Sequence, residues 1–392
     1  MAPIPRLRAY EGPAILSYGF RPFFLLGSLY AGIAILAWLP MFAGDFALPT
    51  AFAPRDWHVH EMLYGFAGAV VAGFLLTAVP NWTGRLPLQG FPLLLLVAAW
   101  LTGRFAVAFS ADLGWSMTML LDLSFLVLLT AAIAREVVAG RNWRNLKVLG
   151  ALSALLVGNA LFHVEARLSG TAEYGIRVGI AATLAMVMLI GGRIVPSFTR
   201  NWLARANPGR LPAAFGNFDK GSMALAIASL VAWTVAPGSR ATGAGLIAAG
   251  LVQAVRLSRW AGDRTWRDPL VLILHVAYAF VPFGFVLVGV SAFGLIPASA
   301  GLHAWTGGAV GVMTLAVMSR ASLGHTGRPL RATPPVQVVY VLATASVLAR
   351  ICAALHTAWT GALLPTAGVL WAAAFLGFSA VYWRVLTGPK VA

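Results

Sequence analysis

Long apolar runs separated by short polar connections dominate this chain. One run, from Met62 to Val79, contains no charged residue and directly follows His58, His60 and Glu61. An apolar run of about eighteen residues is long enough for an α-helix to cross a bilayer. This stretch therefore predicts a membrane helix with titratable, metal-binding side chains at one end, where such groups usually have a function.

Comparable runs recur along the whole sequence, and they predict about twelve membrane helices. No run alternates with a period of two, as the strands of a membrane barrel do. We therefore predict an all-α integral membrane protein, with residues 1–392 forming a single polytopic membrane domain. The runs cover residues 23–43, 58–79, 91–109, 113–138, 146–166, 176–198, 223–236, 243–257, 269–291, 300–319, 336–356 and 361–385.

Two of these runs share a local pattern. His60 precedes the Thr83-Gly84-Arg85 turn by the same distance as His303 precedes Thr326-Gly327-Arg328, and residues 195–199 of the sixth run resemble part of it. Because these are the second, sixth and tenth runs, we interpret the pattern as a threefold repeat of four-helix units, with chance similarity as the alternative. The units would cover residues 1–137, 138–257 and 258–392.

The charge distribution predicts an orientation in the membrane. Only 10% of the residues are charged, 59% are hydrophobic, and the formal net charge is +16. Most of the 28 Lys and Arg residues, including Arg6 and Arg8, fall in alternate connections. By the positive-inside rule both termini are then cytoplasmic. This placement explains the basic charge without a nucleic-acid partner.

Five of the seven histidines fall at one level under this orientation, in the outer third of the bilayer: His58, His60, His163, His303 and His356. Imidazole is a usual protein ligand for haem iron, copper and zinc. We predict His60 and His303 as axial cofactor ligands that could equally hold a metal. We predict His58 and His163 as further metal ligands.

His356, at this level, and the two histidines outside it have other interpretations. His356 lies beside Trp359, and His325 lies in a turn, so we expect hydrogen bonds there. His275 lies deeper in the ninth run, where a hydrogen-bonded core histidine, a cofactor ligand and a proton relay remain alternatives. No CxxCH motif is present, so a covalently attached haem is not expected.

Two acidic side chains inside the runs, Glu61 and Asp122, are candidates for a role. Glu61 is the predicted catalytic residue: it lies three residues after His58, on the same helix face, where it could orient a ligand or accept a proton. His60 shares a face with Tyr64. For Asp122, in the middle of the fourth run, we favour an ion pair or hydrogen bond to a neighbouring helix over a role in a proton path.

Four segments of the chain are distinctive: GFRPFFLLGSLYAG, WHVHEMLYGFAGAVVAGFLLTAVPNWTGR, GGRIVPSFTRNW and HAWTGGAVGVMTLAVMSRASLGHTGRPL. They resemble the NnrS family. The resemblance implies a twelve-helix protein of the bacterial inner membrane that binds haem and copper and is linked to nitric oxide, nitrosative stress and denitrification. It does not say which residues are the ligands.

A fainter likeness links the second run to the haem–copper oxidases and nitric oxide reductases. In those proteins a histidine of helix two ligates haem and precedes a Met, a Phe and a Gly-Phe pair, to which His60, Met62, Phe66, Gly73 and Phe74 are loosely similar. This chain departs from them because its sixth run contains no histidine. A copper site built like theirs is therefore not expected.

The histidine pattern together with the resemblance to the NnrS family predicts a membrane protein that binds haem b, with copper or a second haem as a further cofactor. The resemblance implies that it handles nitric oxide by binding it, by reducing it as a nitric-oxide-reductase-like enzyme, or by releasing iron from nitrosyl complexes. Its partners would be nitric oxide, the lipid bilayer and a redox partner in the membrane or periplasm. One alternative is a bis-histidine electron carrier of the cytochrome b type. Another is a transporter whose pathway uses buried polar residues.

Overall fold

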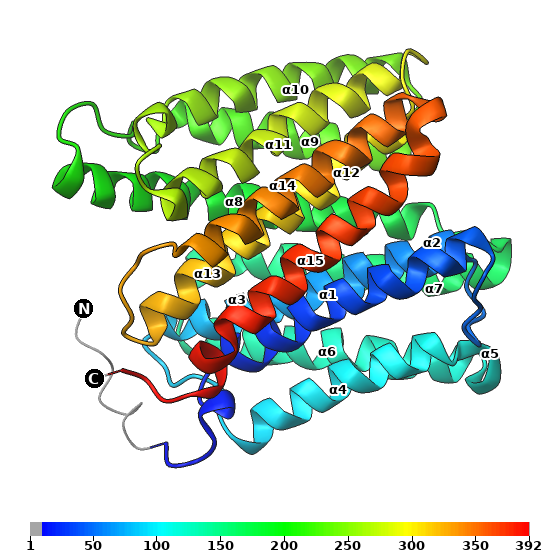
Figure 1. The fold of residues 1–392 in the computed structure, drawn as a ribbon, viewed down its shortest axis with the longest axis horizontal. Coiled ribbons are helices and arrows are strands. Elements are labelled where there is room, and N and C mark those ends of the chain that lie inside the picture. The colour runs from blue at the N-terminus through cyan, green and yellow to red at the C-terminus, as the bar shows by residue number, and fades with distance from the viewer. Residues whose placement is uncertain (1–9, 392) are drawn as a thin grey trace. The chain divides into compact units, whose positions relative to one another are not determined.

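The computed structural model describes residues 10–391, and these residues form helices and no β-strand (Figure 1). Arg6 and Arg8, on which the predicted orientation partly rests, lie outside this range. The chain divides into two compact units. The first holds residues up to 179 together with 321–329 and 378 onwards, and the second holds residues 180–320 and 330–377.

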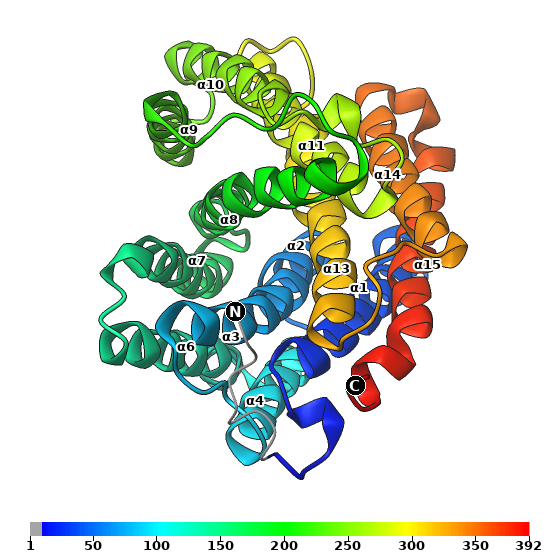
Figure 2. The same cartoon turned by 90° about the vertical axis from the view of Figure 1, so that its left-hand side faces the viewer.

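The first unit is built mainly from the N-terminal helices. The helix α6 lies beside α3, α4 and α7, as the view along the helices shows (Figure 2). The elements are α1 (Phe20–Ala43), α2 (Pro54–His60), a π-helix (Glu61–Phe66), α3 (Ala67–Thr83), α4 (Phe91–Ala108), α5 (Ser110–Leu113), α6 (Trp115–Ala139) and α7 (Leu146–Ser169).

Arg21 joins the two ends of the chain inside this first unit. Its guanidinium is buried and donates from Nη1 to the carbonyl oxygens of Leu386, at 3.0 Å, and Gly388, at 2.6 Å. The last carbonyls of a helix have no partner within the helix. Arg21 therefore caps the C-terminal end of α15 (Thr360–Thr387) from the start of α1.

The second unit contains most of α8 and α15 and the helices between them. It also holds a second π-helix (Ala304–Val312), which directly follows His303. The other elements are α8 (Tyr174–Ala206), α9 (Asn217–Val235), α10 (Arg240–Ser258), α11 (Pro269–Ser291), α12 (Ala298–His303), α13 (Met313–His325), whose end belongs to the first unit, and α14 (Pro334–Leu355).

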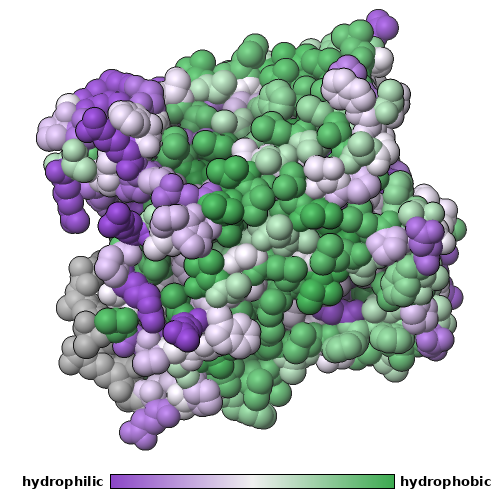
Figure 3. Space-filling model, in the orientation of Figure 1, coloured by the Kyte–Doolittle hydropathy of each residue, from purple (hydrophilic) through white to green (hydrophobic). Residues whose placement is uncertain are grey.

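Eleven helical segments within the described residues are long and apolar enough to cross a membrane. Apolar side chains gather along the helices, and polar ones gather towards their ends (Figure 3). The predicted all-α membrane class is thus confirmed. Of the twelve predicted spans, the one missing from these eleven corresponds to α9. Its mean hydropathy is too low because its first turn contains Asn217, Asp219 and Lys220.

Hydrogen bonds between two loops nevertheless indicate that α9 crosses the membrane together with α10. The loop before α9 and the loop after α10 are bonded to each other: Arg264 donates to the carbonyl of Asn207 at 2.9 Å, and the Ala213 amide donates to the carbonyl of Arg259 at 2.9 Å. Both loops therefore lie on one side of the second unit. Because α10 is a candidate span that begins on the other side, α9 must cross with it.

The threefold repeat remains a prediction, and so do its boundaries. The two copies that contain a histidine do share a local feature, because a π-helix begins at the residue after His60 and at the residue after His303. Single π-turns within helices occur frequently at functional sites. The π-helices therefore indicate that His60 and His303 lie at candidate functional sites.

Candidate metal centre

The centre of the first unit is a set of polar side chains contributed by four helices. His60 is the last residue of α2, Asp122 lies in the middle of α6, and Asn159 and His163 lie one turn apart on α7. Arg104 comes from α4. All five side chains are buried, with at most 5% of the surface of each exposed.

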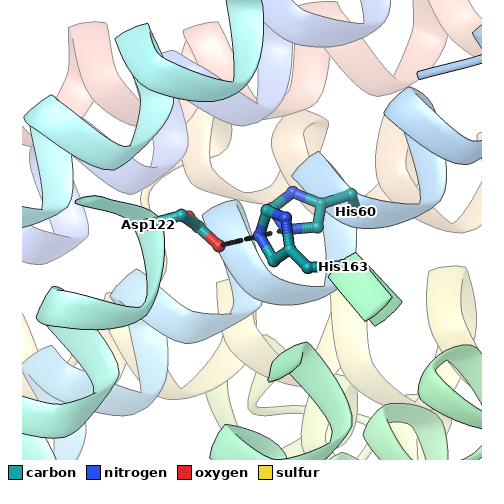
Figure 4. A group of neighbouring side chains, drawn as sticks. All are labelled: His60, Asp122 and His163. Carbon is teal, nitrogen blue, oxygen red and sulfur yellow. Dashed lines mark hydrogen bonds and ion pairs between the residues drawn. The ribbon is translucent and has the colours of Figure 1, made fainter. Parts of the chain in front are cut away.

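Asp122 connects the two histidines. Its Oδ2 atom lies 3.2 Å from Nε2 of His60 and 3.0 Å from Nε2 of His163 (Figure 4). One ligand atom from each of these three residues lies within 4.8 Å of the other two. Two imidazole nitrogens and a carboxylate oxygen at such separations form a donor set that suits Zn, Cu, Fe or Ni.

Asn159 lies between two of these groups. Its Nδ2 donates to Asp122 Oδ2 at 2.8 Å, which directs its Oδ1 towards Nε2 of His60 at 2.9 Å. The other ring nitrogen of His60, Nδ1, lies 2.7 Å from Glu61 Oε1. Neither oxygen carries a hydrogen, so both ring nitrogens of His60 donate and the ring is positively charged in this arrangement.

The charges of the centre balance. Arg104 donates one Nη atom to Glu61 Oε1, at 2.6 Å, and the other to Asp122 Oδ1. Tyr30 donates to the second oxygen of Glu61. Two carboxylates therefore face two cations, His60 and Arg104, which is how buried charges are normally accommodated.

Glycines bring Arg104 and Asp122 into this position. A Cβ on Gly65 would lie 2.5 Å from Nη1 of Arg104, and a Cβ on Gly103 would lie 3.1 Å from the Cα of Asp122. Gly65 belongs to the π-helix, whose first residue is Glu61. Gly65 therefore leaves space for the guanidinium of Arg104, and Gly103 allows α4 to pack closely against α6.

Aromatic rings close the centre around His60. The ring of Phe52 stacks on His60 with centroids 5.6 Å apart, and the ring of Phe162 meets it edge-on at 5.0 Å. Since Asp122 and Asn159 also lie against Nε2, the surroundings of His60 fit a single ion better than a flat macrocycle. The prediction of His60 as an axial haem ligand stays a prediction.

The other predicted site residues have contacts of their own. His58 stacks on Trp38 with centroids 4.3 Å apart, and Glu61 bonds to His60. In the second unit, His303 donates from Nδ1 to the carbonyl of Ser299 at 2.7 Å. His275 there lies 2.7 Å from the hydroxyl of Thr199.

Three residues of the centre were not assigned to a site from the sequence: Arg104, Asn159 and Tyr30. Their polarity inside apolar runs was the available signal, since an ionisable group within a membrane helix is costly and needs a partner. The favoured role for Asp122, an ion pair or a bond to a neighbouring helix, agrees with its contacts to Arg104 and His163.

The fold and this centre together define a multi-pass α-helical membrane protein with a buried group of side chains able to hold a metal. The chain belongs to the NnrS family, described as NnrS protein, whose model matches residues 14–390. No curated protein matches the chain. The family suggests a membrane protein related to nitric oxide.

Proposed function

We propose that this protein binds nitric oxide at a metal centre in the membrane, in the response to nitrosative stress or in nitric oxide reduction that accompanies denitrification. The observation that carries the proposal is the buried group of His60, Asp122 and His163, whose ligand atoms lie within 4.8 Å of one another. Membership of the NnrS family supports the link to nitric oxide. The host membrane would be the bacterial inner membrane, with both termini in the cytoplasm.

Copper is the metal we propose at this centre. His60 and His163 would bind it through Nε2 once each of these atoms has lost its hydrogen, and Asp122 would bind it through Oδ2. A copper ion bound by these side chains could take a small diatomic molecule such as nitric oxide as a further ligand. Glu61 would hold a proton on Nδ1 of His60 and so fix the ring, which is the usual role of a carboxylate behind a ligating histidine.

Haem b is the second cofactor we propose, with His303 as an axial ligand. The bond from Nδ1 of His303 to the Ser299 carbonyl fixes the ring and leaves Nε2 available, which is the arrangement of a typical ligating histidine. Gly307 and Gly311 face Val347 and Trp371, so side chains occupy the space beside these glycines.

A transporter is the second candidate, and one observation favours it. The charges of Glu61, Asp122, Arg104 and His60 balance without an added ion. A buried polar network of this kind could line a pathway for a small polar substrate. A redox partner in the membrane or periplasm would be needed only for the nitric oxide function.

Cofactor analysis of the purified full-length protein tests the proposal. After expression with haem and copper supplied, we expect one equivalent of metal by mass spectrometry, haem b by the pyridine haemochrome assay, and a spectral change on adding nitric oxide. His163→Ala should lose the metal and keep haem, and His303→Ala should do the reverse.

The exposed His356 supplies a control, since His356→Ala should retain both cofactors. Full metal content in His60→Ala, Asp122→Ala and His163→Ala would remove the metal centre from the proposal. A six-coordinate haem that ignores nitric oxide would favour the electron carrier, and protein with neither cofactor would favour the transporter.

A further inference from the structure

Asn159 occupies an unusual position among the ligand atoms of the centre. Its amide lies between Nε2 of His60 and Oδ2 of Asp122, at 2.9 Å and 2.8 Å. It is 1% exposed and lies one helical turn before His163 on α7, so both side chains project from the same face. No other amide of the described residues is bonded to both groups.

We propose that Asn159 is the fourth ligand of the metal centre, binding through Oδ1. This inference rests on the proposed function, because it assumes that His60, Asp122 and His163 hold a metal. A metal with four ligands about 2.1 Å away holds neighbouring donor atoms roughly 3.4 Å apart when the site is tetrahedral. Three of the six donor pairs are in direct contact, at 2.9, 3.2 and 3.0 Å, which is close to that separation. The ligand atoms of His60, Asp122 and His163 all lie within 4.8 Å of one another.

The orientation of the amide supports an oxygen ligand. Oδ1 of Asn159 points towards His60 because Nδ2 is engaged by Asp122. The carbonyl oxygen is the metal-binding atom of an asparagine, whereas the NH₂ group cannot ligate. The same side-chain orientation thus serves both the hydrogen-bonded arrangement seen here and a metal-bound one.

The donor set indicates the class of metal. It would contain two imidazole nitrogens, a carboxylate oxygen and an amide oxygen, with no sulfur among the four. Sulfur ligands select Cu⁺, whereas imidazole and oxygen donors suit Zn²⁺ and Cu²⁺. We therefore expect the centre to take a divalent first-row ion in preference to Cu⁺.

Two substitutions at position 159 separate a ligand from a hydrogen-bonding residue. Asn159→Leu keeps the size of the side chain but removes the oxygen, so affinity for Zn²⁺ and Cu²⁺ should fall at least about tenfold. Asn159→Asp keeps an oxygen in place but cannot donate a hydrogen bond to Asp122. If residue 159 is a ligand, the Asn159→Asp variant should still bind metal at least as tightly as the wild type.

The measurement is competition of the purified full-length protein against a chelator of known affinity, with Zn²⁺, Cu²⁺ and Cu⁺ tested in parallel. The thermal unfolding midpoint, with and without Zn²⁺, gives a second readout. Asn159→Asp should unfold earlier without metal, because it adds a carboxylate beside Asp122, and Zn²⁺ should restore its stability. Asn145→Leu, on the N-terminal cap of the same helix, is the matched control and should bind metal as the wild type does.

The outcomes are distinguishable. Metal binding by the wild type and equal binding by Asn159→Leu would overturn Asn159 as a ligand and leave the proposed metal centre intact. Loss of binding in both Asn159→Leu and Asn159→Asp would assign the residue to hydrogen bonding alone. Tighter binding of Cu⁺ than of Zn²⁺ and Cu²⁺ would overturn the metal class. A wild type that takes up none of the three ions would remove the metal centre itself.

Discussion

At the scale of single residues, the centre depends on one arginine that serves two carboxylates. Arg104 bonds to Glu61 and to Asp122, and each of these acids also contacts His60. A buried ion pair need not stabilise a fold relative to apolar residues of the same volume. Removing one partner, however, leaves a buried charge without compensation.

We therefore expect Arg104→Met to destabilise the protein by about 3–5 kcal/mol, since Glu61 and Asp122 would then share only His60 as a cation. The check is the unfolding midpoint of the purified protein in detergent. Arg177→Met is the control, because Arg177 pairs with the half-exposed Glu173 at the surface and should change stability by less than about 1 kcal/mol. Equal midpoints for Arg104→Met and the wild type would show that this network contributes nothing to stability.

At the scale of elements, the π-helix begins at Glu61, directly after the α-helix that ends at His60. The spacing of three residues puts Glu61 on the helix face of His58. In the structure Glu61 also contacts Nδ1 of its neighbour His60, which the spacing did not predict. The carbonyl of Gly65, within the same π-helix, accepts a bond from Trp100 Nε1 at 3.0 Å, so a neighbouring helix holds the irregular turn.

Gly65→Ala tests this element. A Cβ at position 65 would come within 2.5 Å of Nη1 of Arg104, so the guanidinium must move away from its carboxylates. We expect a loss of about 1–3 kcal/mol in unfolding experiments, together with weaker metal binding. Gly68→Ala is the control, since its Cβ would meet only Phe125 at an ordinary 3.6 Å. Similar effects of the two substitutions would mean that the close approach of Arg104 is unimportant.

The start of α11 gives a second prediction for an element. Asp268 precedes this helix and accepts a bond from the Leu270 amide at 2.9 Å. Asp268→Ala should cost about 1 kcal/mol by removing the cap, whereas Asp268→Asn should cost little because asparagine caps equally well. Thermal unfolding of both variants beside the wild type is the measurement.

The pH dependence of this cap has a definite sign. Burial raises the pKa of Asp268 above its usual value of 3.8. Between those two pKa values the folded state binds more protons than the unfolded state, so the contribution of Asp268 to stability falls as the pH rises through that window. Asp268→Asn lacks this loss. Its stability relative to the wild type should therefore increase as the pH rises from below 3.8 towards neutrality, and the opposite trend would contradict the assignment.

At the scale of the whole molecule, the first unit is closed by a contact between the two ends of the chain. Arg21 reaches the last carbonyls of α15, and Ser28 lies 2.7 Å from Ser379 through their hydroxyl oxygens. Both contacts join residues more than three hundred positions apart, so they form only when the C-terminal helix has been made.

Arg21→Met should release the C-terminal end of α15. Hydrogen bonds from a charged donor contribute about 1.5–3 kcal/mol, so we expect a lower unfolding midpoint and faster proteolysis near residue Gly388. Arg384→Met, at an exposed position of the same helix, should leave both unchanged. Identical proteolysis of Arg21→Met and the wild type would show that α15 is held by its other contacts.

The fold class could be predicted from the sequence because a membrane helix depends mainly on its own residues. Such a helix satisfies its backbone hydrogen bonds internally, so an apolar run such as Met62–Val79 predicts a helix without knowledge of its neighbours. The helix that hydropathy describes least well is α9, whose first turn is polar. Its crossing followed only from bonds between loops, such as that from Arg264 to Asn207.

The candidate site could be derived only in part. His60 and His163 were chosen as metal ligands from their residue type and their position near helix ends, both of which are visible in the sequence. That Asp122 joins them, that Arg104 neutralises it and that Asn159 lies between them depend on how α4, α6 and α7 pack against α2. Spacing along a chain does not specify which faces of separate helices meet, so only the tertiary structure could decide these contacts.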